Sequence, residues 1–224
     1  MKSALMLFCL AVSILFAQFA SASPLNAGDM KKILVLGDSL SGGFGLKPSE
    51  AYPTLLANKL RAAGLNFQVT NASQTGGTTD GGLERLPTHL KRKIDILILE
   101  LGINDAFRGV PVDQIENNLQ QVIDKVKARN PDVRVVIAGM AAPKGFGADD
   151  YVSAFGKMFA ELATRSGALL VPYLLEGVAG DPLLNLPDGI HPNAAGQKVL
   201  AENVWRVLEP VARETAAEPA SHVR

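Results

Sequence analysis

The chain has almost no cysteine and no net charge, and both absences narrow what it can be. Its single cysteine, Cys9, lies in an apolar run near the N-terminus, so the rest of the 224 residues must be held by a core and not by disulfides. The 22 basic and 22 acidic residues cancel, and no block of like charge stands out, which argues against a nucleic-acid groove or an anionic-lipid patch. We therefore expect one domain that binds a small or neutral molecule.

The N-terminus has the pattern of a secretory signal peptide. Lys2 precedes an apolar run over residues 4–17, and Ala20 and Ala22 form an A-x-A cleavage pattern. A bilayer span needs about 20 apolar residues, which is more than this run offers, so cleavage after Ala22 is favoured over an uncleaved membrane anchor. We expect a monomer in the periplasm or outside the cell. The expected divisions are a signal peptide at 1–22, a domain at 23–212 and a frayed tail at 213–224.

Short apolar runs alternate with longer stretches of helical period, which predicts a parallel sheet with helices on both faces. Most runs are apolar throughout, as expected of strands buried on both sides. The expected strands are Ile33–Leu36, Phe67–Asn71, Ile94–Leu101, Val133–Ala138 and Ala168–Val171. The expected helices are Tyr52–Ala63, Thr78–Leu90, Val112–Arg129, Ala148–Arg165 and a last helix from Pro192. The fold class is thus α/β, a three-layer α/β/α sandwich on a five-stranded parallel sheet, with ligands beyond the carboxyl ends of the strands.

Residues suited to acyl transfer follow several of these strands. GDSLS follows the first strand and contains Ser39, a candidate nucleophile, and DGIHP precedes the last helix and contains Asp188 and His191. On this turn Asp188 can accept from Nδ1 of His191 while Nε2 takes the serine proton. The other readings are that Ser39 caps a helix, and that Asp188 caps the last helix with His191 packed on it.

Donors for an oxyanion are available at neighbouring strand ends. NASQTGGTT follows the second strand and LGIND the third, and they contain Gly76 and Asn104. The candidate donors are the backbone amides of Ser39 and Gly76 and the side-chain amide of Asn104. Gly76 could equally be a turn glycine and Asn104 a turn or cap residue. Their position at adjacent strand ends favours a functional role.

The four blocks resemble those of the SGNH, or GDSL, hydrolase family in order and spacing over most of the mature chain. NASQTGGTTDGGLERLP and LELGINDAFRG are similar to the exported bacterial thioesterase, lysophospholipase and arylesterase group of that family. The resemblance implies a flavodoxin-like sandwich, a triad of Ser39, His191 and Asp188, and an oxyanion hole from Ser39, Gly76 and Asn104. Ile103 and Gly77 depart from the pattern expected of the family and bear on substrate preference.

The same loops supply an apolar mouth that suits an acyl chain or an aromatic leaving group. The candidate substrate-binding residues are Phe44, Phe107, Arg108, Val110, Phe146 and Leu186. Several of the apolar ones could instead roof the core, and AFRGVP, which contains Arg108, resembles the mobile loop that closes over acyl chains in that group. We expect no metal and no cofactor, because the sequence has no H-E-x-x-H pattern, no cysteine cluster and no phosphate-binding loop.

The sequence thus predicts a serine esterase that hydrolyses acyl or aryl esters, thioesters or lysophospholipids through an acyl-enzyme at Ser39. One alternative is a carbohydrate O-acetyl esterase, which would place more polar and aromatic residues at the mouth. Another is a non-catalytic module that holds a small ligand at a helix N-terminus, in which Asp188 and His191 would be dispensable.

Overall fold

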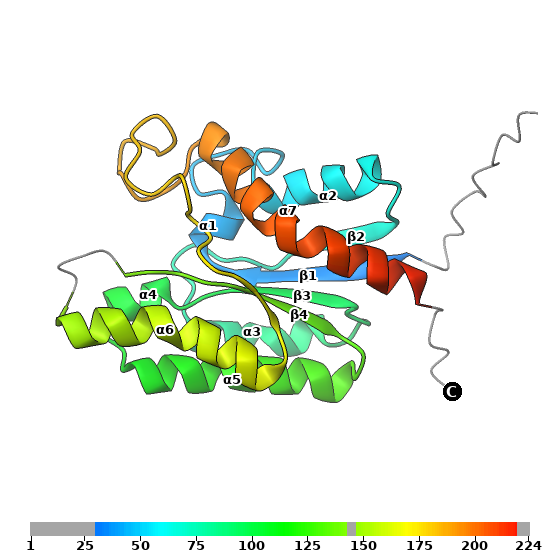
Figure 1. Cartoon of the computed structure of the whole chain (residues 1–224), viewed down its shortest axis with the longest axis horizontal. Coiled ribbons are helices and arrows are strands. Elements are labelled where there is room, and N and C mark those ends of the chain that lie inside the picture. Colours follow the sequence, from blue (N-terminus) through cyan, green and yellow to red (C-terminus); the bar gives the residue numbers. More distant parts are fainter. Residues whose placement is uncertain (1–29, 143–146, 219–224) are drawn as a thin grey trace, which may run out of the picture.

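The computed structural model describes residues 30–142 and 147–218 and shows a single five-stranded parallel sheet between two helical layers (Figure 1). The signal-peptide prediction and Phe146 lie outside these residues. The strand order is β2-β1-β3-β4-β5, which is the flavodoxin-like order. The strands are β1 (Lys31–Gly37), β2 (Phe67–Asn71), β3 (Ile96–Glu100), β4 (Arg134–Ala138) and β5 (Leu169–Val171). The predicted fold class is confirmed.

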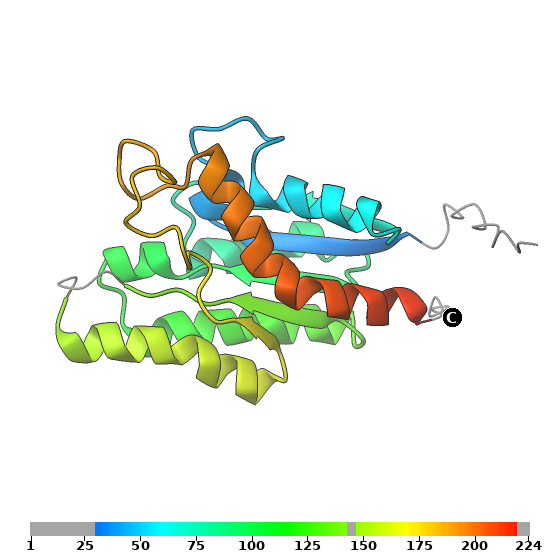
Figure 2. The same ribbon diagram turned by 45° about the horizontal axis from the view of Figure 1, so that its top comes forward.

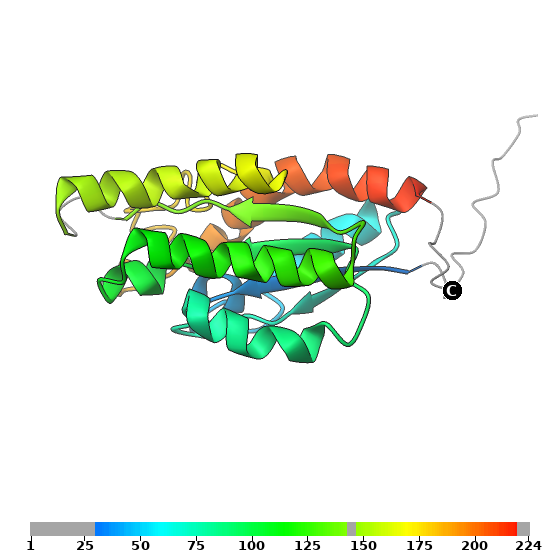
Figure 3. The same ribbon diagram turned by 90° about the horizontal axis from the view of Figure 1, so that it is seen from below.

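The long helices divide between the two faces of the sheet (Figures 1 and 3). One face carries two helices that pack on each other, α2 (Tyr52–Ala62) and α7 (Ala194–Ala217). The opposite face carries α3 (Thr79–His89), α5 (Val112–Arg129) and α6 (Asp149–Ser166). No helix in the two described ranges is long and apolar enough to cross a membrane.

Burial follows the apolar pattern of the strands. All five residues of β3 are buried, and β1 and β4 are buried at every position but one each. β2 lies at the edge of the sheet and is exposed at three of five positions. The aliphatic centre of the sheet therefore provides the rigid platform whose carboxyl edge carries the loops.

The last helix differs from the prediction at both ends. It begins at Ala194 and not at Pro192, because Asn193 is the cap: its side-chain oxygen accepts from the amides of Ala195 and Gly196. It continues to Ala217, so residues 213–217 are helical and not frayed. Thr215 is buried, although this stretch shows no apolar period. An ion pair between Glu214 and Arg134, the first residue of β4, joins this last turn to the sheet.

Two short helices were not predicted, and both begin directly after central strands. They are α1 (Ser39–Gly42) after β1 and α4 (Ile103–Phe107) after β3. The connection from β5 to α7, coloured yellow to orange, lies over the same edge beside α1 (Figure 2). Three loops far apart in sequence therefore meet where ligands of such sheets bind.

Candidate active site

Ser39 is the first residue of α1, immediately beyond the end of β1. Asp38 caps this helix through Oδ1, which accepts from the amide of Leu40 at 2.9 Å. The helix ends after one turn at Gly43, which has a left-handed backbone with φ of 68°. Ser39 is 7% exposed, so it is largely shielded from solvent and does not lie on an open surface. The helix-cap reading of Ser39 does not hold, since Asp38 is the cap.

His191 links Ser39 to Asp188 in one chain of hydrogen bonds. Nε2 of His191 lies 3.0 Å from Oγ of Ser39, and Nδ1 lies 2.7 Å from Oδ2 of Asp188. Oδ1 of Asp188 also accepts from the amides of Ile190 and His191. Gly189 makes this turn possible with a φ of 69°. The geometry is that of a nucleophile, a base and a group that orients the base.

The turn is held to the rest of the domain by its backbone. The carbonyl of His191 accepts from the amide of Leu186 at 2.7 Å, and Asn185 pairs with Pro192 in an isolated bridge. On the other side, Nε2 of Gln197 in α7 donates to the carbonyl of Leu40 in α1. These bonds bring together side chains that are 152 residues apart in the chain.

The environment of Asp188 keeps it ionised. The amide of His191, its side chain and the amide of Ile190 lower the pKa of Asp188 to about 2. The carboxylate therefore remains a hydrogen-bond acceptor for Nδ1 of His191 at neutral pH.

The two other predicted oxyanion donors lie in the segments that follow the neighbouring strands β2 and β3. Gly76 has a φ of 69°, and its carbonyl accepts from Nη2 of Arg108 at 3.1 Å. Nδ2 of Asn104 donates to Oδ2 of Asp38 at 2.9 Å and to the carbonyl of Gly77 at 3.1 Å. Both hydrogens of the Asn104 amide are thus engaged within the protein. The amide of Ser39 is at the first position of a helix, where N–H groups have no intrahelical acceptor.

The aspartate of the LGIND block has a role that the sequence did not reveal. Asp105 is buried, and its two oxygens accept from the amide and the hydroxyl of Thr79 at 2.9 and 2.6 Å. Asn118 of α5 donates to the same hydroxyl. Asp105 therefore fastens α4, which carries Asn104, to the start of α3.

Beneath Ser39 lies a second group that sequence reasoning missed. Glu100, the last residue of β3, is fully buried and accepts from the hydroxyl of Ser41 at 2.6 Å. That hydroxyl also shares a hydrogen bond with the Tyr52 phenol at 2.6 Å. Gly37 lies beside Glu100 across the sheet, and a Cβ on Gly37 would stand 2.6 Å from the Glu100 carboxylate. A glutamate at the end of an apolar strand was the available signal, because such a position is buried.

The predicted substrate-binding residues fall into two groups. Phe44 and Phe107 are 41% and 38% exposed at the rim of the site, and Arg108 is exposed beside Gly76. Leu186 and Val110 are half-buried: Leu186 lies over Gly45, and Val110 packs on the core and accepts from the Tyr151 hydroxyl. Ile190, another exposed apolar residue of the β5–α7 connection, is outside the predicted substrate-binding set.

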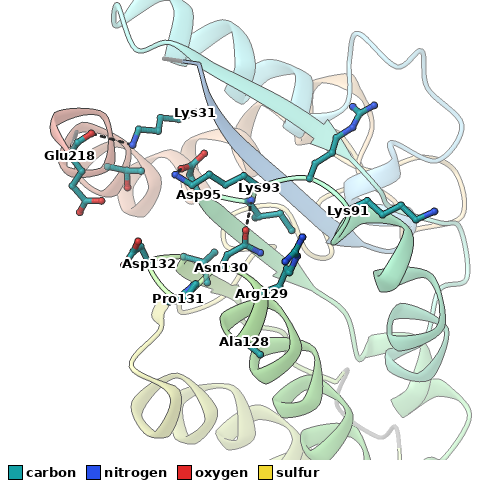
Figure 4. Close-up of a pocket in the computed structure, with 14 residues that line it drawn as sticks. Lys31, Lys91, Lys93, Asp95, Ala128, Arg129, Asn130, Pro131, Asp132 and Glu218 are labelled. Atoms are coloured by element: carbon teal, nitrogen blue, oxygen red, sulfur yellow. Dashed lines mark hydrogen bonds and ion pairs between the residues drawn. The ribbon is translucent and has the colours of Figure 1, made fainter. Parts of the chain in front are cut away.

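Two cavities of the structure are not lined by the residues of the candidate triad. One of about 570 Å³ lies at the opposite edge of the sheet, where Lys31, Ile94 and Val133 precede or begin strands (Figure 4). Basic and acidic side chains line it, and none of Ser39, Asp188 and His191 does. A smaller one of about 350 Å³ adjoins Gly76 and Gly77. Within the described ranges, no group of His, Cys, Asp and Glu could hold a metal ion.

Comparisons with known proteins agree with this geometry. The model of the GDSL-like lipase/acylhydrolase family matches residues 35–199. Esterase TesA of Pseudomonas aeruginosa is 36% identical over 212 residues, which cover 94% of this chain and all of the relative. Thioesterase 1/protease 1/lysophospholipase L1 of Escherichia coli K12 is 36% identical over 180 residues, 80% of this chain and 84% of the relative. A crystal structure of TesA superposes with a TM-score of 0.76 at 38% identity, covering 81% of this chain and 99% of the other. The chain therefore belongs to the GDSL-like lipase/acylhydrolase family and is an SGNH-type esterase.

Proposed function

We propose that the chain hydrolyses esters and thioesters through an acyl-enzyme at Ser39. The observation that carries this proposal is the hydrogen-bond chain from Asp188 through His191 to the Ser39 hydroxyl. His191 takes the proton of Ser39 as its oxygen attacks the carbonyl carbon, and returns that proton to the leaving alcohol, phenol or thiol. A water molecule then gives a proton to His191 and its oxygen to the acyl carbon, and His191 returns that proton to Oγ of Ser39 as the acid leaves.

The negative oxygen of each tetrahedral intermediate is placed near three donors: the amides of Ser39 and Gly76 and Nδ2 of Asn104. Such donors act strongly because they are fixed before charge develops. In the resting site one hydrogen of Asn104 points to the carbonyl of Gly77. We infer that the substrate oxygen replaces this carbonyl as acceptor, while the bond to Asp38 keeps the amide in place.

The substrate class proposed is acyl or aryl esters, thioesters and lysophospholipids. Exposed aromatic rings at the rim, Phe44 and Phe107, suit an acyl chain or an aryl group. The E. coli relative is named as a thioesterase and lysophospholipase, which supports the same range. The signal-peptide pattern at residues 1–22 favours an exported enzyme, and cleavage after Ala22 leaves it without a membrane anchor.

The test is the initial rate of the chain from residue 23 on p-nitrophenyl esters of short, medium and long acyl chains. Ser39→Ala serves as the blank, and Ser153→Ala, an exposed serine of α6, is the matched control. Turnover in the control and none in the blank supports the proposal, and the best chain length reports the size of the acyl site. Equal rates in the blank and the wild type would overturn it. Turnover of acetylated sugars alone would move the assignment to the carbohydrate esterase.

A further inference from the structure

Two carboxyl groups are buried together behind Ser39. Asp38 and Glu100 are both 0% exposed, although they come from the ends of neighbouring strands, β1 and β3. Buried acidic side chains are rare in proteins unless they are paired or hydrogen-bonded. The two carboxyl groups bond the amides of Leu40 and Ser41, which follow Ser39 in α1, so their charge state affects the turn that carries the nucleophile.

The two acids have different partners. Oε2 of Glu100 accepts from the amide of Asp38 at 3.1 Å and from the amide and hydroxyl of Ser41 at 3.2 and 2.6 Å. Its other oxygen, Oε1, is buried with no donor among the described residues. Asp38 has a donor on each oxygen: Leu40 on Oδ1 and Asn104 on Oδ2. An oxygen without a donor is where a carboxyl group can carry its proton.

Adjacent buried carboxyl groups share a proton because two unscreened negative charges in contact are unfavourable. Burial raises the pKa of Glu100 well above its usual range, and the charge of Asp38 raises it further. Burial also raises the pKa of Asp38, to about 6, while bonds from Leu40 and from the Glu100 side chain and the charge of His191 act against that rise. Asp38 is therefore the member of the pair that ionises first.

We propose that Glu100 is a positioning residue that acts as a neutral carboxylic acid. It holds the Ser39 turn through Asp38 and Ser41, donates its proton in a hydrogen bond to Asp38, and leaves the single negative charge on Asp38. That charge then aims the Asn104 amide at the oxyanion. The inference rests on the proposed function, since it assigns Asn104 the oxyanion role.

Charged groups on the surrounding elements fit this assignment. His191 approaches from the loop before α7 and becomes positive as it takes the Ser39 proton, so the Asp38 carboxylate stabilises it in addition to Asp188. Arg85 of α3 donates to the carbonyl of Gly37 at 2.7 Å; burial lowers the pKa of its guanidinium, and the negative charge of Asp38 acts against that fall. From α2, Tyr52 contributes a neutral hydroxyl whose pKa burial raises well above its usual value.

The protonation state can be read without activity. The infrared spectrum at about pH 8, where exposed carboxyl groups are ionised, should contain the C=O stretch of a protonated carboxyl group. The band should vanish in Glu100→Gln and persist in Asp95→Asn. Asp95 is the matched control, because it is a buried acid just before β3 that bonds the Lys32 amide and Lys93 at the far edge of the sheet. A wild-type spectrum without this band would overturn the proposal.

Kinetics test the positioning role. Glu100→Gln keeps a neutral donor and acceptor in place, so kcat should fall by less than about threefold. Asp38→Asn keeps a good helix cap but removes the charge and one acceptor, so kcat should fall by about 10²-fold with KM little changed. Asp95→Asn should leave kcat unaltered.

Two outcomes separate this proposal from the proposed function. If Glu100→Gln loses as much kcat as Asp38→Asn while both remain folded by thermal melting, Glu100 is needed as a charge and the assignment is wrong. If the wild type itself does not differ from Ser39→Ala, the proposed function fails, and the infrared result still decides the state of Glu100.

Discussion

The ring of Phe44 lies against the ring of His191, with the two centroids 4.3 Å apart and the planes tilted by 33°. Phe44 follows the short helix that carries Ser39, so the loop after the nucleophile also packs against the base. Phe44 is thus both an exposed residue at the rim of the site and a direct neighbour of the catalytic base.

Phe44→Leu should lower kcat as well as raise KM, because it removes a surface that restricts the imidazole and part of the acyl contact. We expect kcat/KM to fall about tenfold on a medium-chain p-nitrophenyl ester. Phe107→Leu, at the rim on α4, is the comparison and should act mainly through KM. Equal kcat losses in both variants would show that the ring contact with His191 is unimportant.

Ser39→Ala and His191→Ala should each lower kcat by at least about 10⁴-fold, because the two side chains act as a unit. The double variant should therefore be no slower than either single one. Initial rates of the three proteins, with thermal melting to show that each is folded, make the comparison. A double variant that is slower by the product of the two effects would contradict a shared proton transfer.

The acid side of the pH–rate profile should involve Asp38 but not Asp188. Asp188 has a pKa near 2 and stays ionised, whereas Asp38, with a pKa near 6, becomes neutral as the pH falls and loses the charge that holds Asn104. Protonation of Asp38 should therefore add a fall in rate around pH 6, and Asp38→Asn should lack this fall. Acid limbs of the same shape in the wild type and in Asp38→Asn would rule out a contribution from Asp38.

Asp38 also links stability to pH, with a sign opposite to that of Asp188. Its folded pKa is above its ordinary 3.8, so the folded state binds the proton more tightly and ionisation opposes folding. This contribution to the free energy of unfolding should be full below about pH 4 and lost as the pH rises through about 6. Denaturant titrations of wild type and Asp38→Asn should show that the variant lacks this decline. A decline of equal size in both proteins would assign it to other groups.

Gly37→Ala should destabilise the fold by about 1–3 kcal/mol, because its new Cβ would lie 2.6 Å from both the Glu100 carboxylate and the Ser41 hydroxyl. Gly42→Ala is the matched control, five residues beyond the end of β1 in a position where a Cβ meets nothing within 4 Å. Chemical denaturation measures both. If the two variants were equally stable, the buried acid cluster would be able to shift without cost.

Much of the fold was readable from local pattern. The five strands were predicted within a few residues because continuous apolar runs bounded by turn residues are typical of buried parallel strands. The errors lie at α7: the side chain of Asn193 decides its start, and at its end Thr215 is buried and Glu214 pairs with Arg134 of β4. α1 and α4 are one turn each, too short to show a helical period.

The candidate triad could be proposed from sequence because Asp188 and His191 are three residues apart and a glycine between them permits the turn. The distance from His191 to Ser39 could not be predicted. These two residues are 152 apart in the chain, and their contact depends on how α7 docks on α1. The register of the sheet brings Asp38 and Glu100 together, because β1 and β3 end side by side. Gly37 has no side chain and so leaves space for the Glu100 carboxyl group. Residue types and local spacing thus indicate which chemistry is available, whereas long-range packing sets the distances and the dielectric environment that decide which carboxyl group carries the charge.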